Sequence, residues 1–209
     1  MKKLIFFHLL LTTTFIFSQP AIRNYNKGVK QAHLCEFEKA IDFFSIAITL
    51  DPDFEEAWYN RALAKSKLGR YNEAIADYTK AIDCNSGSAK AYNNRGADQN
   101  ELKNYEAAIA DYNKAIELNP HYAMAYFNRG NTHLALNEFE KALQDYTKAI
   151  ENNSGYADAY FNRAFVKRRL KDFAGSLKDY ERVIVLDPNY PNVEKNIQLV
   201  KSEKQHSMD

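Results

Sequence analysis

The sequence is short of the residues that break a chain or cross-link it. Its 209 residues include only 7 Gly, 5 Pro and 2 Cys. So few Gly and Pro exclude a linker-rich or disordered chain, and two cysteines exclude a disulfide-rich scaffold. The 28 Lys and Arg nearly balance the 27 Asp and Glu, and this argues against a strongly basic nucleic-acid binder. What remains is a chain with 45% hydrophobic residues, enough for a continuous core.

Long apolar runs are also absent, apart from one at the start. Lys2 and Lys3 precede an apolar run at residues 4–17, and the small residue Ser18 follows it. This order predicts an exported protein, periplasmic or secreted, with a signal peptide at residues 1–18, because the run is too short for an ordinary membrane span. An uncleaved anchor is the alternative. Cleavage would leave 26 basic and 27 acidic residues, a charge of −1, and no integral membrane span.

Patterns for catalysis and metal binding are absent as well. His33, His121, His133 and His206 show no metal-ligand spacing with one another or with a cysteine. Neither a Gly-rich phosphate loop nor a nucleophile elbow occurs. The only basic run, at residues 167–171, is too short to indicate a nucleic-acid partner. The sequence therefore predicts no cofactor, no metal, no nucleic-acid partner and no enzymatic activity.

What the sequence does contain is an Asn-Arg pair that recurs every 34 residues. In the second half of each 34-residue copy, apolar residues at positions 20, 21, 24, 27 and 28 mark one face of an α-helix. The first half carries a similar stripe at positions 4, 8, 11 and 14, with Leu68 and Leu136 at position 14. Alignment on the pair gives five copies, at 21–54, 55–88, 89–122, 123–156 and 157–190.

Short polar turns separate the two halves of each copy, and Pro or Asn-Ser-Gly follows each second half. Both signals end helices. Each copy is thus predicted to be a helix–turn–helix hairpin that cannot bury its apolar face alone, so that stacked hairpins form the core. Apolar residues at Val193, Ile197 and Val200 predict a capping helix within residues 191–209.

These residues resemble the tetratricopeptide repeat (TPR) family. The resemblance rests on the 34-residue period, the aromatic residues at positions 4 and 24, the small residues at 8, 20 and 27, and Pro at 32; it covers residues 21–190. It implies an all-α fold, a right-handed solenoid of stacked helix–turn–helix hairpins whose first helices line a concave groove. Departures at Asn24, Ser176 and Val183 lie in the end copies, where caps are expected to differ.

The Arg at position 7 falls on an inward, largely apolar stripe, where an unpaired charge would be costly. Position 23 holds Asp in the same four copies, whereas copy one has Lys27 and Phe43 instead. Positions 7 and 23 lie opposite each other in an antiparallel hairpin. The predicted structural ion pairs are Arg61–Asp77, Arg95–Asp111, Arg129–Asp145 and Arg163–Asp179.

The Asn at position 6 recurs in all five copies, although Asn is a mediocre helix former. A carboxamide offers a donor and an acceptor, so it can pair with the backbone of an extended peptide whatever the peptide's side chains. Some members of the resembling family use such an asparagine ladder in that way. The alternative is that the amides bond only neighbouring repeats or water. The predicted ladder is Asn26, Asn60, Asn94, Asn128 and Asn162.

Aromatic residues on the same helix face extend the predicted peptide-binding site. With Arg168 and Arg169 beyond them, those of the last two copies suit an apolar side chain beside an acidic one. The alternative is inter-repeat packing next to a solvated basic end. A carboxylate clamp of the family's kind is excluded, because it requires Lys at position 5 and no copy has one. The predicted aromatic contacts are Tyr59, Phe127, Phe161 and Phe165.

The predicted function is a non-enzymatic protein–protein interaction module that binds an extended peptide or a partner's helix in the groove. Three alternatives stay open: a structural scaffold that self-assembles into an oligomer, an assembly or secretion factor of the cell envelope that handles unfolded clients, and an enzyme. No disulfide is expected between Cys35 and Cys84. Their helix ends are separated by roughly 20 Å, whereas a disulfide needs Cα atoms within about 7 Å.

Overall fold

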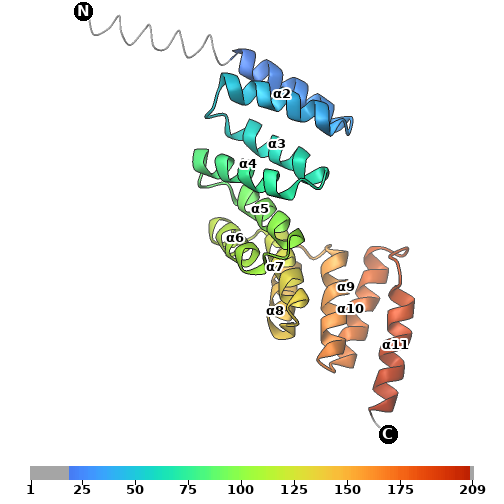
Figure 1. Cartoon of the computed structure of the whole chain (residues 1–209). Helices are drawn as coiled ribbons and strands as arrows, with labels where there is room; N and C mark the ends of the chain where they lie inside the picture. The colour runs from blue at the N-terminus through green and yellow to red at the C-terminus, as the bar shows by residue number, and fades with distance from the viewer. Residues whose placement is uncertain (1–18, 208–209) are drawn as a thin grey trace, which may run out of the picture. The chain divides into compact units, whose positions relative to one another are not determined.

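The computed structural model describes residues 19–207, in which every regular element is a helix (Figure 1). The predicted signal peptide at residues 1–18 lies outside the described residues. Within 19–207, none of the helices is long and apolar enough to cross a membrane. The chain divides into two compact units, which meet in sequence between Asn104 and Tyr105. The predicted all-α fold is confirmed.

The first unit alternates first and second helices of the repeat, each packed against the next. It begins with helical residues 19–33 and continues with α2 (Phe37–Leu50), α3 (Glu55–Lys67), α4 (Tyr71–Cys84) and α5 (Ala89–Glu101).

The second unit continues the same alternation and ends in one extra helix. Its elements are α6 (Tyr105–Leu118), α7 (Ala123–Ala135), α8 (Phe139–Asn152), α9 (Ala157–Arg169), α10 (Phe173–Leu186) and α11 (Val193–His206). Helix α11 packs against α10 and buries Val193 and Val200. The predicted capping helix is therefore present, and it lies beside α10 in Figure 1.

In each hairpin that lies within one unit, the aromatic residue at position 24 is the centre of the core. Small residues at positions 20 and 27 leave room for the ring, as Ala74 and Ala81 do for Tyr78, and all three are fully buried. The first-helix stripe was predicted less well at position 14, where Leu68 and Leu136 are 39% and 37% exposed. Both are the C-caps of their helices and so lie past the last packed turn. The buried rings at position 24 are Phe44, Tyr78, Tyr112, Tyr146 and Tyr180.

Every turn from a first to a second helix uses a left-handed residue at position 15. Gly adopts this conformation freely, whereas other residues do so at a steric cost. Only one of the five turns has Gly, so four carry that cost. The residues and their φ angles are Cys35 (58°), Gly69 (74°), Lys103 (61°), Asn137 (59°) and Lys171 (63°).

The predicted ion pairs connect the two helices of a hairpin. Arg61 Nε and Nη2 donate to the two oxygens of Asp77, both at 2.8 Å. The pairs Arg129–Asp145 and Arg163–Asp179 have the same bidentate geometry, with distances of 2.6–2.8 Å, and these three predictions are confirmed. Arg95 and Asp111 belong to different units, so their pairing stays a prediction.

The sequence did not predict that each of these arginines also stacks on the aromatic residue three positions before it. The Arg61 guanidinium carbon lies 4.7 Å from the centre of the Trp58 ring, and the distance from Arg163 to Tyr160 is 5.4 Å. A ring face attracts a cation, and the contact covers the side of the guanidinium that the carboxylate leaves open. Position 4 is therefore aromatic partly because position 7 is Arg.

Candidate functional site

Asn60 and Asn94, the position-6 amides of copies two and three, connect neighbouring hairpins in the first unit. Asn60 Nδ2 donates to the Tyr25 hydroxyl at 3.0 Å and to the backbone carbonyl of Glu56 at 2.8 Å. Asn94 Nδ2 donates to the Tyr59 hydroxyl at 2.9 Å. Each amide therefore bonds position 5 of the preceding copy, which is the structural alternative that the sequence left open. Both side chains remain half-buried rather than sealed.

Asn162, a position-6 amide of the second unit, has a different partner. Asn162 Nδ2 donates to Asn131 Oδ1 at 2.9 Å, and the same oxygen accepts the Tyr146 hydroxyl at 2.7 Å. Phe127 occupies position 5 here and has no hydroxyl, so Asn131 at position 9 replaces it as the acceptor. Asn128 is half-buried, and Asn26 in the first unit is exposed.

The aromatic residues at position 5 pack into the hairpins behind them. Their rings lie against the buried ring at position 24, as Phe127 does with Tyr146 at 5.8 Å between centroids. Phe127 also packs against Tyr156 at 4.7 Å. Tyr59 and Phe161 make the same contact with position 24, at 5.7 and 5.5 Å. These rings, although half-exposed, therefore stabilise the stack as well as forming part of its surface.

A hollow of about 220 Å³ lies in the first unit, between the first helices of copies one and two. Asn60 is in its wall, and the apolar side chains of Val29 and Leu63 share it. Lys67 and His33, both at position 13, add polar groups. Neither residue was predicted to contact a peptide, although position 13 shares a helix face with positions 6 and 9. The remaining lining residues are Ala32, Phe37 and Ala64.

The Tyr25 hydroxyl that fixes Asn60 stays protonated. Burial, followed by the nearby charge of Glu56, raises the pKa of Tyr25 above its ordinary value, and the hydrogen bond from Asn60 only partly opposes this. The hydroxyl oxygen accepts from the amide, so the amide nitrogen is held by two acceptors. No described group donates to Asn60 Oδ1. That oxygen is therefore available to accept from a ligand.

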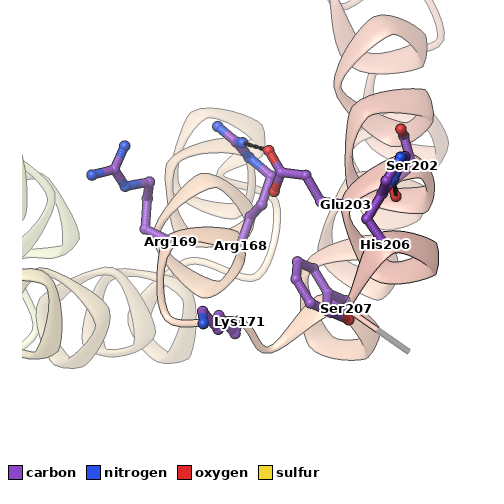
Figure 2. A pocket seen from close by; sticks show the side chains of 8 residues that line it. Arg168, Arg169, Lys171, Ser202, Glu203, His206 and Ser207 are labelled. Carbon is purple, nitrogen blue, oxygen red and sulfur yellow. Dashed lines mark hydrogen bonds and ion pairs between the residues drawn. The ribbon is translucent and has the colours of Figure 1, made fainter. Parts of the chain in front are cut away.

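A second hollow, of about 610 Å³, lies in the second unit where the end of α9 meets α11 (Figure 2). It is rich in basic side chains, because the basic run at residues 167–171 ends α9 and forms the turn after it. Arg168 and Arg169 were expected near the predicted binding face, whereas the wall that α11 supplies was not predicted. The lining residues are Arg168, Arg169, Lys171, Phe173, Ser202, Glu203, His206 and Ser207.

The described residues contain no group of His, Cys, Asp and Glu that could hold a metal ion. Cys35 and Cys84 are both exposed free thiols. Partial desolvation of this largely exposed thiol raises the pKa of Cys84, and nearby carboxylates, Asp53 first, raise it further. A raised pKa leaves less of the reactive thiolate at neutral pH. The residues described in this section can form hydrogen bonds, apolar contacts and ion pairs with a ligand.

Three solved structures that share this fold show the similarity. MamA is 25% identical, with a TM-score of 0.72 over 77% of this chain and 94% of MamA. A tetratricopeptide repeat protein from Parabacteroides merdae is 20% identical, with a TM-score of 0.75 over 91% of this chain and 77% of that one. YrrB, described as a TPR protein with an unusual peptide-binding site, is 21% identical, with a TM-score of 0.69 over 85% of this chain and 92% of YrrB.

Family profiles match the repeats directly, although no curated protein matches the sequence. The profile of the tetratricopeptide repeat matches residues 55–88, 123–156 and 157–190, and a further TPR repeat profile matches residues 100–137. The matches together cover more than half of the chain, and the helices alternate as that repeat requires. The chain belongs to the tetratricopeptide repeat family.

Proposed function

We propose that this protein is a non-enzymatic binding module that holds an extended peptide, or a partner's helix, against the face formed by its first helices. Proteins of this family generally act in protein–protein interaction, as the similarity to the TPR profiles implies. The observation that carries the proposal is the hollow in the first unit, where Asn60 lies beside Val29 and Leu63. The hollow combines an apolar floor with one fixed amide.

The chemistry of this hollow suits a peptide. Its volume of about 220 Å³ accommodates a single side chain rather than a large cofactor. An apolar side chain of the peptide would contact Val29 and Leu63, and the backbone N–H of the same peptide residue would donate to Asn60 Oδ1. Because the two acceptors already hold the amide nitrogen, the oxygen is oriented before the ligand arrives, and preorganisation lowers the cost of binding. The fold that the chain shares with YrrB, a TPR protein with a peptide-binding site, supports the proposal.

A pair of variants separates binding from stability at this hollow. A displayed library of random peptides is selected on the wild-type protein, and the affinity of a selected peptide is then measured for Asn60→Ala and Tyr25→Phe. Both variants lose the same inter-repeat hydrogen bond and about 1 kcal/mol of stability. Only Asn60→Ala loses the ligand-facing oxygen.

We expect Asn60→Ala to weaken binding about tenfold, whereas Tyr25→Phe changes it by about twofold or less. Leu63→Asp, which places a charge in the apolar floor, is expected to abolish binding. If the library yields no binder, or if both Asn60→Ala and Leu63→Asp bind as the wild type does, the peptide site is not here.

Export is the second part of the proposal. The basic start, apolar run and small residue at Ser18 support cleavage there, and the mature chain would function in the periplasm or outside the cell. Intact-protein mass spectrometry of material from the native cell tests this. A mass that corresponds to a chain starting at Gln19 is expected, and retention of residues 1–18 would contradict it.

A further inference from the structure

The hollow at the end of α9 collects more positive charge than it neutralises. Arg168, Arg169 and Lys171 line it together with one carboxylate, that of Glu203. Figure 2 shows Arg168 directed toward Glu203, while Arg169 points away from α11. No described carboxylate lies within ion-pair distance of Arg169 or Lys171. The mature chain is nearly neutral, so this excess is local.

The single carboxylate satisfies Arg168 only in part. Arg168 Nη1 donates to Glu203 Oε1 at 2.6 Å, and its Nε is buried without a hydrogen-bond partner. A guanidinium can bind a carboxylate through two parallel hydrogen bonds, as Arg163 does with Asp179. The Arg168–Glu203 contact is therefore weaker than this fold achieves elsewhere, and Glu203 itself is 38% exposed.

The hollow is continuous with the predicted peptide-binding face. The guanidinium carbon of Arg168 lies 5.3 Å from the centre of the Phe165 ring, and Phe165 is one of the aromatic residues predicted to contact a peptide. Positions 9, 12 and 13 of α9 share one helix face, so Phe165, Arg168 and Arg169 follow one another toward the turn. A peptide on the first-helix face of the second unit would therefore reach the basic side chains at its end.

We propose that this hollow binds an acidic segment of a partner protein, whose carboxylates contact Arg169 and Lys171 and replace Glu203 on Arg168. The proposal rests on the proposed function, because it specifies the chemistry of a segment bound against the first-helix face of the second unit. Phe173, which also lines the hollow, supplies apolar surface for the segment's backbone and stems. Helix α11 then has two roles: it caps the last hairpin, and it holds Glu203 as an internal competitor for the ligand.

One triple variant and a matched control test the charge. In the variant Arg168→Gln/Arg169→Gln/Lys171→Gln the hollow loses three positive charges. The control Lys80→Gln/Lys114→Gln/Lys148→Gln loses the same number of charges from the second helices, where each lysine forms an ion pair with an acid three residues later. A random peptide library is selected on the wild-type protein, on the variant and on the control, and circular dichroism confirms that all three remain helical.

We expect the peptides selected on the wild type and the control to be enriched in Asp and Glu, and those selected on the variant not to be. The affinity of an acidic peptide selected on the wild type is expected to fall about tenfold or more in the variant, since charge-assisted hydrogen bonds are lost. Because Arg169 and Lys171 are exposed, the affinity is also expected to fall with added salt.

Glu203→Gln gives an opposite readout that a purely structural role would not produce. It removes the internal competitor while leaving the three basic side chains, so the acidic peptide is expected to bind about threefold more tightly, although the cap loses an ion pair. Weaker or unchanged binding by Glu203→Gln would show that Glu203 does not occupy the ligand's position.

The outcomes separate this inference from the proposed function. If peptides are selected without acidic enrichment and bind through Asn60, the inference is wrong and the proposed function stands. If acidic peptides bind and are lost in the basic-site variant but not in Asn60→Ala, the inference holds and the hollow of the first unit is not the site. If no peptide is selected, both are wrong.

Discussion

The Ser66 hydroxyl donates a 2.6 Å hydrogen bond to Asp98 Oδ1, while Asp98 Oδ2 is buried without a partner. Asp98 occupies position 10, where Ala64 and Val166 stand in the second and fifth copies. A carboxylate thus takes an apolar position of the core and is only 3% exposed. Burial raises the pKa of Asp98 to about 6; the hydrogen bond from Ser66 lowers it, and the charge of Glu101 raises it further.

The first prediction concerns Asp98→Asn, which keeps an acceptor for Ser66 but cannot ionise. The folded-state pKa of Asp98 is above its unfolded value of about 3.9, so the folded state holds the proton more tightly. The contribution of the protonated Asp98 carboxyl to stability is fully present below about pH 4 and is lost as the pH rises through about 6. We therefore expect Asp98→Asn to be more stable than the wild type at pH 7.5, by on the order of 3 kcal/mol, and equal to it near pH 4.

Urea unfolding of both proteins from pH 4 to pH 8 measures this difference. The comparison between variant and wild type is needed because other groups act in the opposite direction. Glu138, for example, has its pKa lowered by Lys141 and then by His133, so its contribution is lost as the pH falls. A difference between Asp98→Asn and the wild type that does not grow with pH would contradict the buried-acid account.

The second prediction compares two arginines in equivalent ion pairs. Besides its arginine, Asp179 accepts from Lys167 Nζ at 2.8 Å, whereas the residue equivalent to Lys167 beside Asp145 is His133, with Nε2 at 3.8 Å. Removal of one partner leaves an uncompensated buried charge, which costs about 3–5 kcal/mol. We expect Arg129→Leu to lose that much, and Arg163→Leu to lose less because the lysine remains.

Chemical denaturation gives both free energies, and His133→Lys provides the control. In the Arg129→Leu background this change supplies the cation that the fifth copy has, so it is expected to restore part of the loss. Equal destabilisation by Arg129→Leu and Arg163→Leu, without rescue by His133→Lys, would mean that position 11 does not share the charge of position 23.

The ion pairs could be predicted from sequence because Arg and Asp are present or absent together among the copies of one chain. The position-24 core could be predicted because a helix face leaves a regular pattern. The bond from Asn60 to Tyr25 joins positions of two different copies. It depends on the distance between hairpins, which the pattern within one copy does not contain. The basic hollow was missed because one wall comes from α11, which lies outside the repeat.

The third prediction uses the left-handed turns. Lys103 has φ 61°, and a residue with a side chain in that conformation costs about 1–2 kcal/mol. Glycine avoids this cost, although it loses more backbone entropy on folding, which offsets part of the gain. We expect Lys103→Gly to stabilise the protein by about 0.5–1 kcal/mol. Thermal unfolding measures this as a rise in melting temperature.

The reverse change serves as the matched test of the same turn. Gly69 has φ 74°, and a Cβ added there meets no atom within 4 Å, so only the backbone conformation opposes Gly69→Ala. A loss of about 1 kcal/mol is expected. If Gly69→Ala were neutral and Lys103→Gly destabilising, the turn would tolerate side chains at position 15 without cost.

The fourth prediction separates two aromatic residues of the predicted binding face. The Phe161 ring packs against Tyr180 at 5.5 Å and Tyr190 at 5.1 Å between centroids, so it joins the last hairpin to the turn that follows. Phe165 instead lies beneath the Arg168 guanidinium in the approach to the basic hollow. We expect Phe161→Ala to lose about 2–4 kcal/mol of stability. Phe165→Ala is expected to lose less stability but to weaken the binding of an acidic peptide more.

Both quantities come from the same protein samples, with unfolding in urea for stability and titration of an acidic peptide selected on the wild type for affinity. Phe161→Leu is the control, since it keeps apolar volume at the hairpin junction and is expected to recover most of the stability lost in Phe161→Ala. Affinity is measured well below the melting temperature of each variant, where nearly all of the protein is folded. Differences in stability then do not affect the measured affinities. If Phe161→Ala reduces affinity more than Phe165→Ala under those conditions, the prediction is wrong. The peptide would then contact α9 at Phe161, the ring that packs against Tyr180 and Tyr190, rather than at Phe165.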